Sequence, residues 1–307
     1  MKGPWAQGLE LIVASFLAAT PIVAQNATAV ESRCGLRTPS SEARSIVGLP
    51  TGDVFCPLIA DPKGMHSFLS YQRTIGEDDS LTTIGAIGIA DEFGIVRWGG
   101  TRLGSGVQLS LQAGIFAQFD LDSESYDLLN ADYIVGLPLT IHAGWFSARA
   151  RVYHQSSHLG DEFLLRPQDS IRVNLSFESA EMIVSADAGA LRVYGGGEYL
   201  FNRSPDDLEH YVAHGGAELR PMRPYLSMGP FGLVRPIAAV DLKSSQEQDW
   251  KPSISIRAGL EFDRRRMSDP PARRWSLFFE SYSGPSPYGQ FFREEIQYAG
   301  IGIHFQI

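Results

Sequence analysis

WFSARARVYHQSSHLGDEF, the stretch from Trp145 to Phe163, decides how the rest of the chain is interpreted. Between Phe146 and Ser156 its residues alternate in character, and successive side chains of a β-strand point to opposite faces. One face carries Phe146, Ala148, Ala150, Val152, His154 and Ser156. The other carries Ser147, Arg149, Arg151, Tyr153 and Gln155. The stretch therefore predicts a strand whose apolar face ends in a histidine and a serine, while its polar face carries two arginines.

Such a strand has two interpretations. In a water-soluble sandwich or lipocalin-like barrel, the arginine face would point to solvent. In an outer-membrane barrel the arginines would line the lumen, and His154 and Ser156 would face lipid. The alternation is compatible with both, so the choice depends on the remainder of the chain.

Composition excludes several classes of protein. The chain has 307 residues, of which 44% are apolar and 20% are charged, which is enough to form a sizeable core. No run of eighteen apolar residues follows the N-terminus, so we expect no transmembrane helix. A formal net charge of -9 argues against a nucleic-acid partner. The sequence also lacks a P-loop, a dinucleotide-binding fingerprint and a His-Glu-x-x-His run.

The first residues resemble an export signal. Lys2 is followed by an apolar run over residues 11–19 and by the small residues Ala27-Thr28-Ala29, which suit cleavage. We therefore expect a signal peptide over residues 1–29.

The next segment, residues 30–65, is rich in Ser, Pro, Gly and Arg and has no strand or helix period. It predicts an irregular periplasmic N-terminal segment. Both cysteines of the chain, Cys34 and Cys56, fall in it. Export to an oxidising compartment would permit a disulfide, although two unrelated thiols are the alternative.

Residues 66–307 alternate repeatedly between apolar and polar side chains, and we expect them to form one all-β domain. Twelve such segments follow each other, at 66–75, 81–90, 105–119, 128–141, 146–157, 170–186, 190–201, 210–221, 230–242, 252–263, 273–283 and 294–307. Their length suits a tilted membrane crossing, and their number is even. The sequence therefore predicts a single transmembrane antiparallel β-barrel with about twelve strands.

The connections and the polar faces agree with this prediction. Odd-numbered connections are polar and acidic, whereas even-numbered ones include tight turns at 142–145 and 187–189. The polar faces carry both arginines and glutamates, which predicts a lumen filled with ion pairs. The closing segment is apolar on one face, which suits insertion by the barrel-assembly machinery. We therefore expect a protein of the cell outer membrane in contact with its lipids, and leave the oligomeric state open.

The outward end of the strand at 146–157 suggests a catalytic site. A serine hydroxyl is a weak nucleophile until a histidine accepts its proton, and a third group orients that histidine. We expect the next strand to begin near residue 170 with Leu175 and Phe177 facing lipid, and to show a bulge around 178–182. Asp169 would then lie beside Ser156 on the lipid-facing side. The predicted catalytic residues are thus Ser156 as nucleophile, His154 as base and Asp169 as orienting acid.

The loop after this strand suggests a metal. Asp161 and Glu162 supply carboxylate oxygens, which Ca²⁺ prefers as ligands. Ca²⁺ bound by these two residues is the cofactor that we consider. His158 lies on the same face as Ser156 and is a second candidate base. The alternative is that these polar side chains only mark the lipid headgroup boundary.

Two resemblances bear on this site. His154-Gln155-Ser156 is similar to the His-x-Ser strand motif of outer-membrane phospholipase A and of lipid A deacylase, which are lipid-facing serine hydrolases on barrels. The phospholipase motif continues with Asn-Gly, whereas Ser157-His158 follows here. The resemblance implies hydrolysis of phospholipid or lipopolysaccharide acyl esters by Ser156 and His154.

A broader resemblance covers about residues 50 to 307. It rests on the segments FCPLIADP at 55–62, HQSSHLGDE at 154–162, GGEY at 196–199 and SPYGQFF at 286–292. These look like the signature segments of the bacterial envelope family known as domain of unknown function 1207. The resemblance implies a Gram-negative envelope protein with an outer-membrane barrel, and the family has no assigned activity. Three functions stay open: a lipid-facing serine hydrolase, a non-catalytic structural or binding barrel, and a narrow channel, which a mixed-charge lumen disfavours.

Overall fold

The computed structural model describes residues 46–75, 81–99, 105–165, 173–221, 226–229, 232–263 and 274–306. The chain divides into two units, Met1–Val30 and Glu31–Ile307, and every described residue belongs to the second. The predicted signal peptide, Cys34 and Asp169 lie outside the described residues. In the described ranges, no helix has the length and apolar character needed to cross a membrane.

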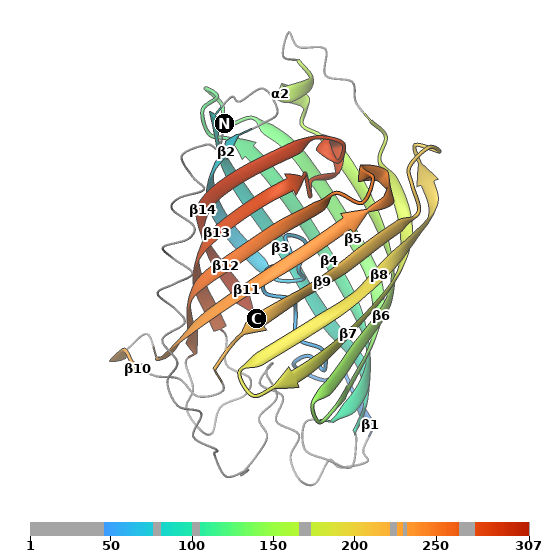
Figure 1. The fold of residues 1–307 in the computed structure, drawn as a ribbon, viewed down its shortest axis with the longest axis vertical. Coiled ribbons are helices and arrows are strands. Elements are labelled where there is room, and N and C mark those ends of the chain that lie inside the picture. Colours follow the sequence, from blue (N-terminus) through green and yellow to red (C-terminus); the bar gives the residue numbers. More distant parts are fainter. Residues whose placement is uncertain are drawn as a thin grey trace. The chain divides into compact units, whose positions relative to one another are not determined.

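Within the described residues, twelve strands form a closed antiparallel barrel (Figure 1). Each strand pairs with the next along the chain, and the last strand pairs with the first, which closes the ring. The strands are β2 (Ser67–Ile75), β3 (Leu81–Gly99), β4 (Gly106–Asp120), β5 (Leu128–Ala143), β6 (Phe146–Leu159), β7 (Ser176–Ala188), β8 (Leu191–Ser204), β9 (Tyr211–Leu219), β11 (Leu233–Ser245), β12 (Pro252–Asp263), β13 (Arg274–Pro285) and β14 (Glu295–Gln306). The predicted fold class is confirmed.

A few short elements lie outside the ring. The strand β1 (Ile46–Gly48) pairs with β3, and β10 (Leu226–Ser227) pairs with β11. The short helices are α2 (Asp161–Leu164), η2 (Gln246–Gln248) and η3 (Gly289–Phe291). We call the end of the barrel that carries α2 and η3 the upper end, as it is drawn in Figure 1.

The strand boundaries differ from the prediction by more than three residues at two places. β3 continues to Gly99 instead of ending at residue 90, because its last residues pair with both β4 and β1. β7 begins at Ser176 instead of near residue 170. The second difference changes which residues lie beside His154 and Ser156.

The two tight turns at the lower end have a clear local cause. Gly144 has φ +70° and Gly189 has φ +62°, values that glycine adopts without steric cost. Each glycine begins the turn of a hairpin, one joining β5 to β6 and the other β7 to β8. These are the connections for which the sequence predicted tight turns.

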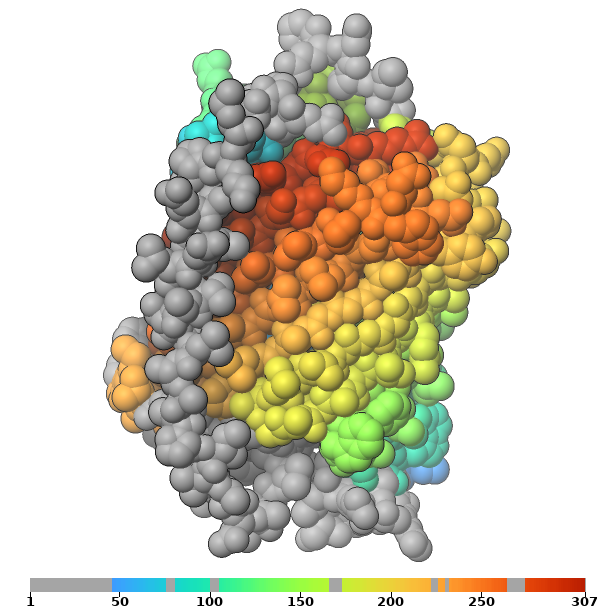
Figure 2. All heavy atoms as spheres, in the orientation of Figure 1, coloured from blue at the N-terminus to red at the C-terminus, as the bar shows by residue number. Residues whose placement is uncertain are grey.

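The two faces of the wall are inverted relative to a soluble barrel. On β6, Val152 points outward and is 54% exposed, whereas Arg149 and Arg151 point inward and are 5% and 6% exposed. On the side shown in Figure 2, the side chains of the strands from β8 to β14 form a continuous outer wall. An apolar exterior around a charged interior is the pattern of barrels that face lipid. The interpretation as a soluble barrel is therefore wrong.

The lumen is filled by ion pairs that cross between strands. Glu181 on β7 accepts hydrogen bonds from Arg149 Nε at 2.9 Å and Arg151 Nη2 at 2.6 Å. Further arginine–glutamate pairs that line the lumen among the described residues are Arg192–Glu218, Arg220–Glu261, Arg235–Glu261 and Arg257–Glu280. Buried charges persist only when they are paired, so the paired lumen agrees with the prediction from the polar faces.

The segment that precedes β2 also lies in the lumen. We call residues 49–66 the plug; its Phe55 and Leu58 are 2% and 1% exposed. Its amide at Ile59 donates to Glu218 Oε1 at 2.8 Å, and its Asp61 binds Lys243 Nζ at 2.9 Å. Barrel arginines also donate to plug carbonyls, in the pairs Arg97–Thr51 at 3.0 Å, Arg192–Cys56 at 3.1 Å and Arg257–Ile59 at 2.7 Å.

This position corrects one expectation. We expected residues 30–65 to form an irregular periplasmic segment, but the plug part of it binds in the barrel interior, where side chains of the lumen bind its backbone. Cys56, within the plug, is disulfide-bonded. No free cysteine occurs among the described residues.

The upper end of the lumen is covered by the connection between β13 and β14. We call residues 286–294 the cap loop; its amides at Gly289 and Gln290 donate to Asp132 Oδ2 at 3.1 Å and Asn130 Oδ1 at 3.0 Å. The Gln290 side chain donates to the carbonyl of Ser157 at 2.8 Å. The plug and the cap loop thus close the interior.

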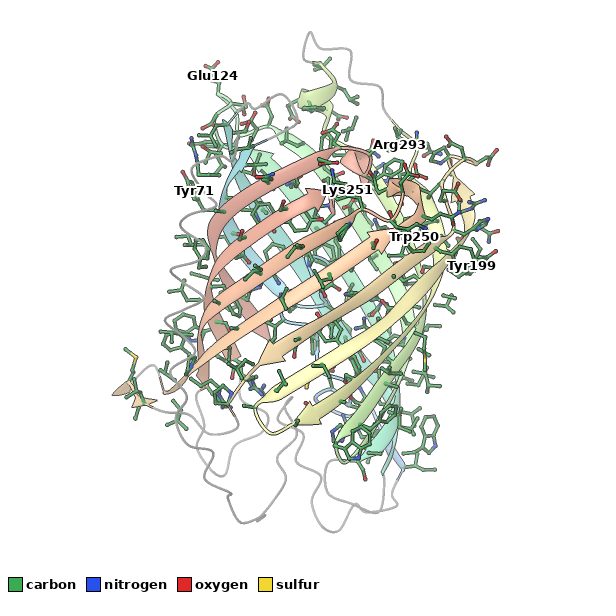
Figure 3. The ribbon with its side chains drawn as sticks, in the orientation of Figure 1. Tyr71, Glu124, Tyr199, Trp250, Lys251 and Arg293 are labelled. Carbon is green, nitrogen blue, oxygen red and sulfur yellow. The ribbon has the colours of Figure 1, made fainter. Side chains whose placement is uncertain are left out.

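The cap loop is also tied to its neighbours at the surface. Arg293, labelled in Figure 3, donates to Asp207 Oδ2 at 3.0 Å and to Glu247 Oε1 at 2.7 Å. These acids belong to the connections that follow β8 and β11. One arginine therefore joins three of the acidic connections at the upper end.

Candidate active site on the outer surface

The upper part of β6 carries the predicted histidine and serine on its outward face. His154 and Ser156 alternate with the buried Gln155 and Ser157, which are 8% and 3% exposed. The side chain of His154 is 41% exposed. Both predicted residues thus point away from the lumen.

The pairing of β6 with β7 brings two further side chains close. The Ser157 amide donates to the Leu175 carbonyl at 3.0 Å, so the neighbouring pair Ser156–Ser176 is a non-hydrogen-bonded pair of the antiparallel ladder. The same parity makes His154–Glu178 a non-hydrogen-bonded pair. Side chains approach each other most closely at such pairs. These two adjacent pairs therefore place four side chains close together on the outer surface. We call these four residues the outer block: Ser156, Ser176, His154 and Glu178.

Glu178 contacts the histidine directly. Its Oε1 lies 3.2 Å from His154 Nδ1, and its side chain is 32% exposed. A carboxylate can only accept a hydrogen bond, so an ionised Glu178 places the proton on Nδ1 of a neutral His154. That tautomer leaves Nε2 unprotonated, as a general base requires.

Glu178 takes the place that we expected for Asp169. We predicted that Leu175 and Phe177 face lipid, but they are 3% and 8% exposed and pack in the lumen. The alternation of β7 is unbroken, and its irregularity lies in the pairing with β8 between Ser176 and Glu178. Odd-numbered residues of β7 therefore point inward, and the argument that set Asp169 beside Ser156 fails.

The two predicted catalytic residues, Ser156 and His154, do not contact each other directly. Within the described residues, no hydrogen bond links Ser156 to His154, although they share one face two positions apart. Catalytic hydrogen bonds often form only when substrate is bound.

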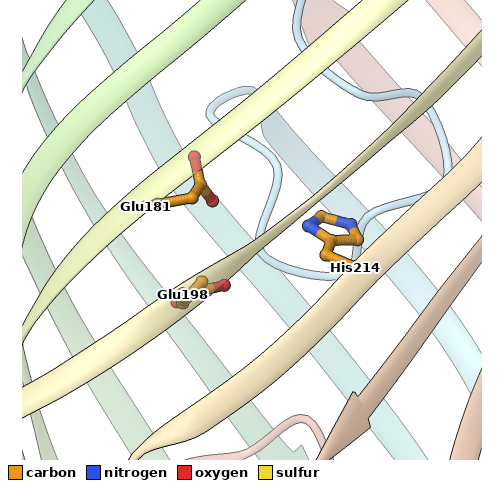
Figure 4. Close-up of side chains that lie close together, drawn as sticks. All are labelled: Glu181, Glu198 and His214. Carbon is orange, nitrogen blue, oxygen red and sulfur yellow. The ribbon is translucent and has the colours of Figure 1, made fainter.

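The predicted metal ligands do not form a cluster. Asp161 and Glu162 are exposed in the first turn of α2. In the described part of the chain, the group of potential ligands is instead Glu181, Glu198 and His214, whose donor atoms lie within 4.8 Å of one another (Figure 4).

That second group is better explained without a metal. Both oxygens of Glu181 already accept from Arg149 and Arg151, and two guanidinium groups would repel a divalent cation. His214 Nε2 lies 2.7 Å from Asp241 Oδ2. We therefore interpret the group as part of the ion-pair network.

Residues 22–307 match the model of the family described as protein of unknown function (DUF1207). The chain belongs to this family. The resemblance found in its separate segments is thereby confirmed. Membership in DUF1207 assigns no role to His154 or Ser156. No curated protein matches the sequence.

Solved structures show what the DUF1207 barrel resembles. The outer membrane phospholipase dimer with bound calcium from Salmonella typhi is 11% identical, with a TM-score of 0.52 over 78% of this chain and 90% of that chain. Outer membrane phospholipase A from Escherichia coli is 12% identical, with a TM-score of 0.50 and the same coverage of 78% and 90%. At this low sequence identity, the structural similarity shows a shared fold and nothing about activity. The DUF1207 member thus has a β-barrel fold like those of outer-membrane proteins.

Proposed function

We propose that this barrel is a lipid-facing serine hydrolase that cleaves acyl esters of envelope lipids. The observation that supports it is the contact of His154 Nδ1 with Glu178 Oε1 at 3.2 Å on the outward face, with Ser156 next to it on the same face. Ionisable groups on the lipid side of a membrane protein are costly and usually functional. His154 and Ser156 make no contact that stabilises the lumen, and a catalytic role would explain why they lie on the outward face.

The proposed reaction follows from the tautomer. His154 Nε2 takes the Ser156 proton as Oγ attacks the ester carbonyl carbon, and Glu178 stabilises the imidazolium that forms. The tetrahedral intermediate then expels the alcohol, which receives the proton from Nε2, and an acyl-serine remains. Water, activated by the same histidine, releases the fatty acid and restores Ser156.

The surroundings of the site suit a lipid substrate. Below it, the outward face carries Val135, Val152 and Met182, which are 48%, 54% and 50% exposed. Tyr133 and His158 form an edge-to-face aromatic contact at 5.6 Å on the upper side. An acyl chain lying along the apolar residues would bring its ester to the level of Ser156. In the predicted orientation this level lies in the outer leaflet, where phospholipid and lipopolysaccharide acyl esters occur.

The interior argues against a channel. The plug, the cap loop and the ion pairs together occupy the described lumen. A hydrolase on the outer surface needs no open lumen. A non-catalytic envelope barrel is the alternative, and it would leave the outward polar group without a purpose.

The test is fatty-acid release from mixed micelles of phospholipid and of lipopolysaccharide by the refolded full-length protein. Each lipid is assayed with Ca²⁺ and with a chelator, because Asp161 and Glu162 remain candidate ligands. We expect activity in the parent and none in Ser156→Ala or His154→Ala, with all three proteins folded by heat-modifiable electrophoretic mobility. A folded parent that is inactive on both lipids would refute the proposal and leave the structural role.

A further inference from the structure

We propose that Ser176 donates the hydrogen bond that stabilises the oxyanion when Ser156 attacks an ester. This inference rests on the proposed hydrolase function and adds a fourth residue to its site. Acyl transfer passes through a tetrahedral intermediate whose oxygen carries negative charge, and donors aimed at that oxygen usually supply a large part of catalysis. The question is which donors the outer surface can offer.

The backbone beside the nucleophile cannot supply them. The Ser157 amide is engaged with the Leu175 carbonyl at 3.0 Å. Ser156 pairs with Tyr133 on the opposite side, and the Gly160 amide, which has the same parity, donates to Leu129 of β5 at 3.1 Å. Ser156 therefore belongs to a hydrogen-bonded pair with β5, and its amide is also used. A nucleophile in the middle of a sheet must find its donors among side chains.

Ser176 is the best placed of those side chains. It lies directly opposite Ser156 in a non-hydrogen-bonded pair, where α-carbons are about 4.5 Å apart and side chains stand close together. It is partly exposed, on the same outward face as His154 and Glu178. Within the described ranges its hydroxyl makes no hydrogen bond. It is thus available to an incoming group.

The other outward donors fit less well. Tyr133 opposes Ser156 in a hydrogen-bonded pair, in which side chains stand further apart, and its ring contacts His158 at 5.6 Å. His158 lies two positions further along β6, on the side of Ser156 away from His154. Ser176 alone lies across the narrow gap from the nucleophile, in the same block as His154 and Glu178.

The role follows from this arrangement. While Ser156 Oγ bonds to the carbonyl carbon, the carbonyl π electrons move onto the oxygen, and the Ser176 hydroxyl donates to that oxygen without transferring its proton. The hydrogen bond is strongest in the tetrahedral state and weak in the ester ground state. Loss of the hydroxyl should therefore lower kcat and leave KM nearly unchanged.

The experiment compares Ser176→Ala, Ser176→Thr and the parent in mixed micelles. The matched control is Ser283→Ala, which removes an exposed outward serine from β13, distant along the ring from β6. Two readouts are used: ester hydrolysis and labelling of Ser156 by a long-chain alkyl fluorophosphonate, in which an oxygen–phosphorus bond forms and fluoride leaves. We expect Ser176→Ala to lower kcat and the labelling rate about 100-fold, Ser176→Thr to retain most of both, and Ser283→Ala to match the parent.

The outcomes separate this inference from the proposed function. If Ser156→Ala is inactive while Ser176→Ala retains the parent kcat and labelling rate, the hydrolase stands and the role of Ser176 is refuted. If Ser176→Thr is as impaired as Ser176→Ala, the hydroxyl is not the cause and the role is likewise refuted. If the folded parent neither hydrolyses nor labels, both proposals fail together.

Discussion

Ser156 and Ser157 are neighbours on β6, and the two faces on which they lie follow different rules. Ser157 points into the lumen, is 3% exposed and donates to Asn130 Oδ1 at 2.9 Å. Ser156 points outward, and within the described residues its hydroxyl makes no hydrogen bond. Polar groups in the lumen are explained by their partners. A polar group on the apolar face that stabilises nothing indicates a function.

The largest expected effect separates these two serines. Ser156→Ala should lower ester hydrolysis by about 10³-fold or more, because the nucleophile is removed. Its free energy of unfolding should change by less than about 0.5 kcal/mol, because Ser156 has no partner to lose. Initial rates in micelles and urea unfolding in detergent measure the two quantities.

Ser157→Ala is the matched control and should do the reverse. It should reduce the free energy of unfolding by about 1–2 kcal/mol, since Asn130 loses a buried donor. Its specific activity should equal that of the parent. A Ser157→Ala variant as inactive as Ser156→Ala would show that the two faces are not independent.

A substitution that breaks the ion pairs of the lumen should lower stability strongly and leave activity unchanged. Glu181→Ala leaves the guanidinium groups of Arg149 and Arg151 buried without their carboxylate. We expect the free energy of unfolding to fall by about 3–5 kcal/mol, while the activity of the folded fraction stays unchanged. Unfolding in urea, with activity normalised to folded protein, makes this comparison. Unimpaired stability would mean that the lumen tolerates unpaired charge.

A smaller effect is expected for the acid on the outer surface. Glu178→Ala removes the acceptor for His154 Nδ1 and should lower kcat about 100-fold. Glu178→Gln retains an acceptor oxygen but not the negative charge, and we expect a loss of about tenfold. Equal losses would assign the effect to charge alone, and no loss in either variant would remove Glu178 from the site.

A further expected effect concerns the pH dependence of stability and the plug. Burial alone would raise the pKa of Asp61, but the charge of Lys243 and its hydrogen bond to the carboxylate hold that pKa well below its ordinary value. A lowered pKa adds stability above the unfolded value of about 3.9 and loses it as the pH falls further.

Asp61→Asn should therefore reduce the free energy of unfolding by a similar amount, about 1–3 kcal/mol, at about pH 7 and about pH 5. The difference in free energy of unfolding between parent and variant should become smaller below about pH 4. Urea unfolding of both proteins across this range tests it. If the difference in free energy of unfolding changed between pH 7 and pH 5, that result would contradict the lowered pKa of Asp61.

The sequence predicted the strands well because alternation is a direct record of which face meets lipid. That period places the arginines on one face of β6 and His154 and Ser156 on the other. The rest of the chain was needed to predict which of the two faces points inward. The acid was missed because the same rule fails where the lumen is apolar. Leu175 and Phe177 pack in the interior in a cluster with Tyr153 and Leu200, so an apolar side chain there does not indicate a lipid-facing position. Glu178 lies three residues before Glu181 on β7 and therefore on the opposite face. Counting back from Glu181, which faces the lumen, would have placed Glu178 on the outward face.

The plug was missed for a different reason. Residues 49–66 have no repeating pattern, and a segment without a period carries no signal about where it lies. Barrel arginines donate hydrogen bonds to its carbonyl oxygens, as Arg257 does to Ile59. Every residue has a backbone carbonyl, so such a contact does not depend on the residue type. A contact of that kind leaves no mark in the sequence of the segment that it binds.

The pairing of β2 with β14 joins the two ends of the sheet, whereas every other pairing in the ring is between consecutive strands. The plug immediately precedes β2 and bonds to arginines and acids from strands across the ring, including Glu218 of β9 and Arg257 of β12. The strand that closes the ring is therefore also the strand to which the plug is covalently attached. Closure of the wall and filling of the lumen thus depend on one continuous stretch of chain.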